Sequence, residues 1–254
     1  MKICGIVQAR MSSTRLPGKV LKELPLGSGV TAIQQVIRRL KKSKYIDEII
    51  LATTKEKEDM ELVGISEIEN VKPFRGSLND VLERYYFAAQ ENGADVIVRI
   101  TGDCPCIDSD IVDLVIKRHL EEKTDYTSNT IKKTYPDGLD AEVFNFMTLE
   151  RAYKNAQRDF EREHVTPYMY EQPDMFKIGN VEADEKLYGP EKRITLDTLE
   201  DYAFLCVIFD FLYDPQRHFS AQAIMDLFRE KPWLDFISTK VSRKESMTHW
   251  RNSL

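Results

Sequence analysis

The chain has 254 residues and a net charge of −6 at neutral pH, with 42% hydrophobic and 31% charged residues. This length and balance predict one large globular domain with a sizeable core. The acidic charge argues against a general nucleic-acid-binding protein, although a local cluster of arginines and lysines can still bind a small anion. Because the sequence shows no signal peptide and no apolar run of membrane-spanning length, we expect a cytoplasmic protein without membrane contact.

The four cysteines do not form a metal-binding pattern. Cys4 lies in an apolar strand and Cys206 in an apolar helix, which is typical of buried thiols. Cys104 and Cys106 form a C-x-C pair, but no Cys or His pair at zinc spacing accompanies them. We therefore do not expect a zinc site, and a reducing compartment fits this use of cysteine.

Strand and helix patterns alternate over the first 120 residues. The predicted strands span 2–7, 46–53, 71–74 and 95–100, and the predicted helices span 30–41, 78–90 and 111–119. Ser77 is expected to cap the second of these helices, with Gly93 as its stop signal. This alternation predicts a mostly parallel sheet with right-handed crossovers, and hence an α/β fold.

The pattern changes between about residues 124 and 183. An alternating, antiparallel strand is predicted at 140–147, followed by a helix from Thr148 and another at 164–170. We interpret this segment as a lobe inserted into a single domain of residues 1–254. The sheet is expected to resume at 193–197. Helices at 199–213 and 221–229, the latter capped by Ser220, and a polar tail at 238–254 are expected to follow.

A cationic loop directly follows the first predicted strand. It carries Arg10, Arg15 and Lys19, and three hydroxyls from Ser12 to Thr14. Guanidinium forks, an ammonium and free backbone N–H groups are suited to phosphates, and the end of the first strand is where open α/β sheets bind anions. The alternative is an ordinary surface loop with solvated charges. The loop has neither the P-loop pattern nor the G-x-G-x-x-G pattern of dinucleotide-binding folds.

The loop Q-A-R-M-S-S-T-R-L-P-G-K-V-L resembles the nucleotide-binding signature of the CMP-sugar cytidylyltransferases. It is most similar to the spore coat polysaccharide biosynthesis protein F branch, and its S-T-R-L-P-G-K core is close to 3-deoxy-manno-octulosonate cytidylyltransferases. The resemblance implies a three-layer α/β/α, nucleotide-diphospho-sugar transferase-like fold that binds CTP. Gln8 stands where the better-characterised acid-sugar branches have proline, which leaves the choice of base and sugar open.

The resemblance also implies roles for individual residues. The implied catalytic residues are Arg10, Arg15, Lys19 and Asp103. The implied nucleotide-binding residues are Ala9, Arg10, Ser12, Ser13, Thr14, Arg15, Lys19, Arg75, Ser77, Asp80, Thr101 and Asp103. The implied sugar-binding residues are Tyr135, Asp137, Asp140, Glu142, Arg162, Glu163, His164 and Arg193. His164 is equally well explained as a structural histidine.

Two aspartates are candidate ligands of a Mg²⁺ cofactor. Asp103 follows the strand at 95–100 in a G-D-x-P segment, and Asp197 lies in R-I-T-L-D-T-L-E-D. A carboxylate at the end of a strand can hold a divalent cation against phosphates, and the resemblance implies that these two form the site. Each aspartate could instead cap a turn or helix. Asp108 and Asp110 match the D-x-D pattern of glycosyltransferases, but their place before apolar helical spacing favours a helix cap.

The sequence therefore predicts a Mg²⁺-dependent cytidylyltransferase that transfers CMP from CTP to a nonulosonic or octulosonic acid for polysaccharide or glycan biosynthesis. A homodimer is implied by the resemblance, and no nucleic-acid partner is expected. The alternatives are a nucleotide-sugar-dependent glycosyltransferase of related fold and a non-catalytic nucleotide- or sugar-binding homologue. A sugar-1-phosphate nucleotidylyltransferase is disfavoured because its glycine-rich G-x-G-T-R-L-x-P loop is absent.

Overall fold

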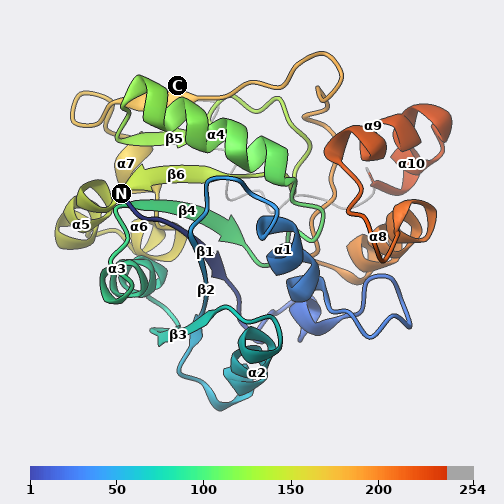
Figure 1. Cartoon of the computed structure of the whole chain (residues 1–254), viewed down its shortest axis with the longest axis horizontal. Coiled ribbons are helices and arrows are strands. Elements are labelled where there is room, and N and C mark those ends of the chain that lie inside the picture. Colours follow the sequence, from blue (N-terminus) through green and yellow to red (C-terminus); the bar gives the residue numbers. More distant parts are fainter. Residues whose placement is uncertain (239–254) are drawn as a thin grey trace.

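The computed structural model describes residues 1–238, which form one central sheet covered by helices (Figure 1). The sheet has seven strands in the order β3-β2-β1-β4-β6-β5-β7. The strands are β1 (Ile3–Gln8), β2 (Glu48–Thr54), β3 (Lys72–Gly76), β4 (Val96–Thr101), β5 (Tyr126–Ser128), β6 (Glu142–Asn145) and β7 (Ile178–Asn180). The predicted α/β class, with a mostly parallel sheet, is confirmed.

The first four strands along the chain are parallel, so their carboxyl ends meet at one edge of the sheet. In β1, Gln8 pairs with Ala52 of β2 on one side and with Thr101 of β4 on the other. Strand β6 then runs antiparallel to β4, which places its first residue, Glu142, opposite Arg99 near the same edge. Strand order reverses at β1 and β4, and this is the point where open α/β sheets bind their ligands.

Helices cover both faces of the sheet. The first half contains the helices α1 (Ala32–Leu40), α2 (Met60–Ile68), α3 (Val81–Glu91) and α4 (Ser109–Glu122) and the short 3-10 turns η1 (Lys19–Leu21) and η2 (Lys57–Asp59). The second half contains α5 (Phe146–Asn155), α6 (Asp159–His164), α7 (Pro167–Tyr170), α8 (Leu199–Leu212), α9 (Ala221–Glu230) and α10 (Leu234–Ser238). Figure 1 shows α8, α9 and α10 grouped together at one side of the sheet.

Alternating strand residues divide the core into two layers. Ile3 and Val7 of β1 pack with α1, α4, α8 and α9 on one face, whereas Cys4 and Ile6 pack with α3, α5 and α7 on the other. Successive side chains of a strand point to opposite faces, so a strand that is apolar throughout must be covered on both sides. The result is the predicted three-layer α/β/α arrangement.

The structure corrects several local expectations. The N-cap of α3 is Asp80, not Ser77, since the Asp80 carboxylate accepts from Glu83 N at 2.8 Å while Ser77 Oγ accepts from Asp80 N. The segment 193–197 is not a strand; it makes one isolated bridge, between Arg193 and Asp137. The helix expected at 164–170 is two short helices, α6 and α7, separated by Val165 and Thr166.

Other local expectations hold. Strand β6 is antiparallel to its neighbours, as predicted for the alternating segment, and β5 and β7 extend the main sheet beyond it. Ser220 caps α9 by accepting from Ala223 N at 3.2 Å. The predicted polar tail, apart from Ser238 at the end of α10, lies outside the described residues. In residues 1–238, none of the helices has the length and apolar character needed to cross a bilayer.

Candidate active site

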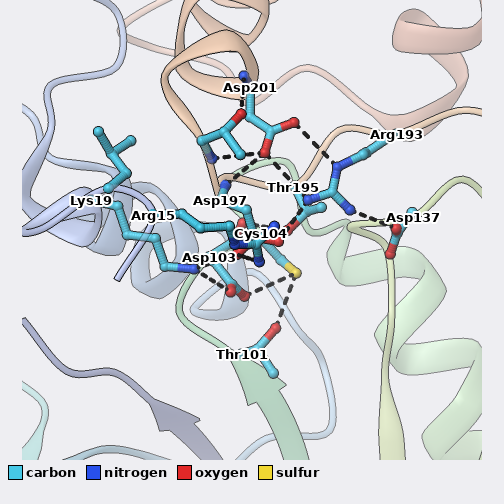
Figure 2. A network of polar contacts seen from close by, with 12 residues as sticks. Arg15, Lys19, Thr101, Asp103, Cys104, Asp137, Arg193, Thr195, Asp197 and Asp201 are labelled. Atoms are coloured by element: carbon cyan, nitrogen blue, oxygen red, sulfur yellow. Dashed lines mark hydrogen bonds and ion pairs between the residues drawn. The ribbon is translucent and has the colours of Figure 1, made fainter. Parts of the chain in front are cut away.

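The cationic loop returns to the carboxyl edge of the sheet and is fixed there by backbone contacts. Met11 O accepts from Ser13 N at 2.9 Å and from Gly18 N at 3.0 Å, which closes the loop on itself. Met11 N donates to the Asp59 carboxylate at 2.7 Å, and this bond ties the loop to the segment after β2. Lys19 then starts the turn η1 with its side chain directed to the ends of β4 and of the 193–197 segment (Figure 2).

Lys19 joins the two aspartates that the sequence singled out. Its Nζ lies 2.7 Å from Asp103 Oδ2 and 2.8 Å from Asp197 Oδ1. Arg15 approaches the same Asp197 oxygen at 3.0 Å. Lys19 and Asp197, which are 178 positions apart in the chain, therefore belong to one compact charged group. Figure 2 shows these side chains converging at the sheet edge.

The charges in this group stabilise one another. Burial by itself would lower the pKa of the Lys19 ammonium, but Asp103 and Asp197 outweigh burial and raise it. Burial would likewise raise the pKa of the Asp197 carboxyl, yet Lys19, Arg193 and Arg15 together lower it to about 2. Asp197 is therefore a carboxylate and Lys19 an ammonium at neutral pH.

Arg193 organises the acidic side of the site. Its guanidinium lies 2.6 Å from Asp197 Oδ2, 3.0 Å from Asp137 Oδ2 and 3.2 Å from Asp201 Oδ1. Asp201 also accepts from the backbone N–H groups of Asp197 and Thr198, both at 2.9 Å, as part of the capping box of α8. Asp201 is not among the residues predicted for the site; its spacing of four from Asp197 and eight from Arg193 was the available signal.

The 193–197 segment lies against the end of β4 instead of joining the sheet. Leu196 N donates to Asp103 O at 2.8 Å, and Thr195 Oγ1 donates to the same oxygen at 3.1 Å. These bonds bring Asp197 beside Asp103. Gly102 permits the sharp exit from β4, because a Cβ there would lie 2.9 Å from both Gln8 O and Ile33 Cδ1.

The two aspartates fit a magnesium ion in their chemistry. Their carboxylate oxygens already converge on one cationic centre, the Lys19 ammonium, and carboxylate oxygens are the protein ligands Mg²⁺ prefers. Among residues 1–238, no three His, Cys, Asp or Glu side chains are grouped to hold a metal by themselves. Phosphate oxygens and waters would have to complete the coordination, as is usual for Mg²⁺ with nucleotides.

Comparisons with known proteins show the family of the chain. A family model described as cytidylyltransferase matches residues 4–239. The chain belongs to the cytidylyltransferase family. The prediction from the loop motif is confirmed, and with it the assignment of the chain as a nucleotidyltransferase.

Three similar proteins illustrate the relationship. The uncharacterized protein MJ1063 of Methanocaldococcus jannaschii is 41% identical over 249 residues, covering 96% of this chain and 97% of that protein. Spore coat polysaccharide biosynthesis protein SpsF of Bacillus subtilis is 34% identical over 212 residues, covering 82% and 86%. The solved structure of a cytidylyltransferase from Leptospira borgpetersenii superposes with a TM-score of 0.87 at 34% identity, covering 96% of this chain and all of that one.

Some predicted nucleotide-site residues of this cytidylyltransferase lie apart from Lys19, along the ends of β2 and β3. Arg75 donates to Thr54 O at 3.0 Å and to Glu56 O at 3.1 Å. The Asp80 carboxylate receives Arg162, which was predicted for the sugar side. Arg162, predicted to bind the sugar, therefore pairs with a residue predicted to bind the nucleotide.

The remaining predicted residues of the loop are mostly exposed. Ala9 is buried, whereas Arg10, Ser12 and Thr14 are exposed, and Ser13 Oγ accepts from Leu16 N at 3.5 Å.

At the end of β4, Thr101 Oγ1 contacts Cys104 Sγ at 3.1 Å. Burial raises the pKa of the Cys104 thiol well above its usual value, and the nearby charges of Asp103, Asp140 and Asp137 add to this effect. The Cys104 thiol therefore stays protonated at neutral pH.

The other predicted sugar-side residues are spread more widely. Tyr135 is buried, and its hydroxyl donates to Glu182 O at 3.4 Å. Glu142 is buried in a network with Arg99, Tyr126 and Thr166. On α6, Glu163 is exposed, and the His164 ring packs on Phe160 with the centroids 4.5 Å apart.

The D-x-D segment lies outside the charged group. Asp108 Oδ1 accepts from Asp110 N at 2.8 Å as the N-cap of α4, and Asp108 Oδ2 accepts from Ala221 N at 2.6 Å. The helix-cap interpretation is confirmed. The D-x-D segment, which would have favoured a glycosyltransferase, therefore has a structural role, because Asp108 caps α4 and links it to α9.

Proposed function

We propose that this cytidylyltransferase transfers CMP from CTP to an acidic sugar of the nonulosonic or octulosonic type, with release of pyrophosphate. The convergence of Arg15 and Lys19 with Asp103 and Asp197 carries the proposal, because it offers cations for a polyphosphate beside carboxylates for a divalent cation. The S-T-R-L-P-G-K core of the loop supports a sugar acid as acceptor. The product would serve polysaccharide or glycan biosynthesis, as the name of the relative SpsF suggests.

In the proposed reaction the oxygen of a sugar hydroxyl attacks the α-phosphorus of CTP, and the hydroxyl proton passes to solvent water. The bond from that phosphorus to the oxygen bridging to the β-phosphate breaks, and pyrophosphate leaves in line. Arg10, Arg15 and Lys19 bind the β- and γ-phosphates and stabilise the charge that develops on the leaving group. Lys19 has to exchange its two carboxylate partners for phosphate oxygens, and both kinds of contact suit an ammonium.

The proposed cofactor is Mg²⁺ held by Asp103 and Asp197. When bound, it withdraws charge from the phosphate oxygens and orients them. Arg193 keeps Asp197 in place through a bond of 2.6 Å. The backbone carbonyl of Asp103 is held by Leu196 N and Thr195 Oγ1, which both donate to it. Positioning and electrostatics account for the chemistry, so no side-chain nucleophile is required.

We also propose that the acidic sugar lies on the side of Asp137, Asp140 and Arg193. Carboxylates there can accept hydrogen bonds from sugar hydroxyls, and the Arg193 guanidinium can attract the sugar carboxylate. Homodimerisation through the 124–183 lobe is part of the same proposal.

Pyrophosphate release tests the proposal. The wild type is assayed with Mg²⁺, each of the four NTPs and a panel of nonulosonic and octulosonic acids, beside Asp103→Ala and the matched control Asp110→Ala. We expect release with CTP and one sugar only, lost in Asp103→Ala and retained in Asp110→Ala, whose exposed side chain lies on α4 away from the charged group. Equal release by the Asp103→Ala variant would contradict the assignment of the site.

A further inference from the structure

One buried arginine at the carboxyl edge of the sheet has no counter-ion. Arg84, in the first turn of α3, is only 2% exposed. Among the described residues its guanidinium has no hydrogen-bond or ion-pair partner, and its Nε is buried without an acceptor. Its backbone N–H donates to Asp80 O at 3.2 Å. A buried guanidinium normally has several acceptors, because desolvating it without them is costly.

The charges around Arg84 do not neutralise it. Asp59 is occupied by Thr54 Oγ1 and Met11 N, and Asp80 by Glu83 N and Arg162. Arg10 lies close enough to repel it. Burial first, and Arg10 in addition, lower the pKa of the Arg84 guanidinium despite the opposing effects of Tyr85, Asp59 and Asp80.

An unpaired acceptor lies on the same face of the sheet. Gln8 ends β1, and its Oε1 is buried without a donor. Gln8 follows Cys4 and Ile6 in the alternation of β1, and both of these face the layer that contains α3. One unpaired acceptor and one unpaired cationic donor therefore lie on the α3 face of the sheet, at its carboxyl edge.

The structure around β3 makes room for Arg84. Gly76 ends β3, and a Cβ on it would lie 2.8 Å from Arg84 Cγ and 3.1 Å from Arg84 Cβ. The stem of Arg84 thus crosses the end of β3, beside Arg75 and Ser77 and on the opposite side of β1 from β4 and Asp103. Arg75 and Ser77, which flank Gly76, are predicted nucleotide-binding residues, so the proposed CTP would reach the end of β3.

We propose that Arg84 and Gln8 together read the base of the nucleotide and select cytosine over uracil. This inference rests on the proposed function, since it needs a pyrimidine nucleotide at the edge. Cytosine offers acceptors at N3 and O2 and a donor at its 4-amino group. The Arg84 guanidinium can donate to N3 and O2, and Gln8 Oε1 can accept from the amino group.

The same two residues would reject uracil. Uracil carries a hydrogen on N3, which would face a guanidinium N–H, and an oxygen at position 4, which would face Gln8 Oε1. Each contact would leave a buried polar atom unpaired, and this is how a site excludes a competing ligand.

Nucleotide binding without sugar tests the pair. Dissociation constants for CTP and for UTP are measured by calorimetry, with MgCl₂ present, for the wild type, Arg84→Met, Gln8→Met and Arg39→Met. Arg39 is the matched control, since it is 3% exposed, has an unpaired Nε and donates to Phe219 O from the last turn of α1. Thermal denaturation of each variant is recorded in parallel.

We expect the wild type to prefer CTP, and Arg84→Met and Gln8→Met each to reduce the ratio of CTP to UTP affinity by about 10-fold or more. Arg39→Met should keep the wild-type ratio even where its melting temperature falls. Equal weakening of CTP and UTP by both variants would overturn the inference, because it would indicate a purely structural role.

The outcomes also separate this inference from the proposed function. A wild type that binds CTP and UTP equally would contradict base selection while leaving nucleotidyl transfer intact. A wild type that binds neither would contradict both. If Arg84→Met does not fold, Gln8→Met decides alone, since Gln8 is only partly buried and its Oε1 makes no contact that folding needs.

Discussion

At the scale of single residues, the site is centred on one lysine. Lys19 pairs with both Asp103 and Asp197. Arg15 and Arg193 add positive charge at Asp197, so two carboxylates can lie side by side at the edge of the sheet. The sequence predicted Lys19 as a phosphate ligand and the aspartates as metal ligands, and nothing in the spacing indicated that they contact each other. The contact depends on where the 193–197 segment ends, which local sequence does not specify.

Arg15 is the residue whose role is most easily isolated. Its side chain is 34% exposed and contacts Asp197 alone among the described residues, so Arg15→Ala should leave the melting temperature nearly unchanged. Loss of a preorganised donor to the leaving group should lower turnover by about 100-fold, measured as kcat for pyrophosphate release. Arg118→Ala, which removes an exposed arginine paired with Glu122 on α4, is the control and should keep full turnover. Unchanged turnover in Arg15→Ala would remove the loop from the mechanism.

His119 should make stability depend on pH. Burial lowers its pKa from 6.5, against smaller raising effects of Asn145 and Asp125. A depressed native pKa means that the unfolded chain binds more protons, so stability is lost as the pH falls below about 6.5. In His119→Gln, the free energy of unfolding between pH 7 and 5.5 should fall less steeply, by up to about 1.4 kcal/mol per pH unit. Parallel curves for the two proteins would show that His119 does not titrate in this range.

At the scale of elements, Asp108 joins two helices. It caps α4 and also accepts from the first backbone N–H of α9. Asp108→Ala should lower the free energy of unfolding by about 1–3 kcal/mol and leave turnover nearly unchanged. Asp110 is exposed and lies two residues from Asp108, so Asp110→Ala should lower the free energy of unfolding far less. Denaturant unfolding measures both variants. A folded Asp108→Ala protein without activity would restore the D-x-D segment as a candidate site.

Glu142 is a second carboxylate with structural contacts, and it lies near the carboxyl edge of the parallel strands. It pairs with Arg99 across β4 and β6 and accepts from Tyr126 at 2.6 Å and Thr166 at 2.7 Å. Removing one member of a buried pair leaves the other charge uncompensated, so Glu142→Ala should cost about 3 kcal/mol of stability. A stable variant with a raised KM for the sugar would instead favour the sugar-binding role that the sequence predicted for Glu142.

Most of the strands and helices in the first half of the chain could be predicted from the sequence. Apolar runs and helical spacing predicted β1, β2, β3, β4, α1, α3 and α4, because hydrophobic periodicity is strong where both faces of a sheet are covered. The segment 193–197 misled because Ile194 and Leu196 alternate like a strand and are buried, yet the backbone bonds to Asp103 and Asp137 instead of a ladder. Helix α2 was not predicted; it is short, and its centre is Gly64, which weakens helical propensity.

At the scale of the whole molecule, the site exists only because the fold joins distant segments. Residues 15–19, Asp103, Asp137 and 193–201 meet at one edge, and the sheet order between β1 and β4 brings them there. The proposed homodimer is checked by light scattering after size exclusion, where the expected mass is twice that of the chain. A monomer at assay concentration would contradict dimerisation.

The most direct test of nucleotidyl transfer follows the α-phosphate itself. CTP labelled at that phosphate is incubated with the protein, Mg²⁺ and the sugar acid that supports pyrophosphate release, and the products are identified by mass spectrometry. The account predicts that the label appears in a CMP-sugar formed in equal amount to pyrophosphate. Label recovered as free CMP whether or not sugar is present, or only as unreacted CTP, would contradict it.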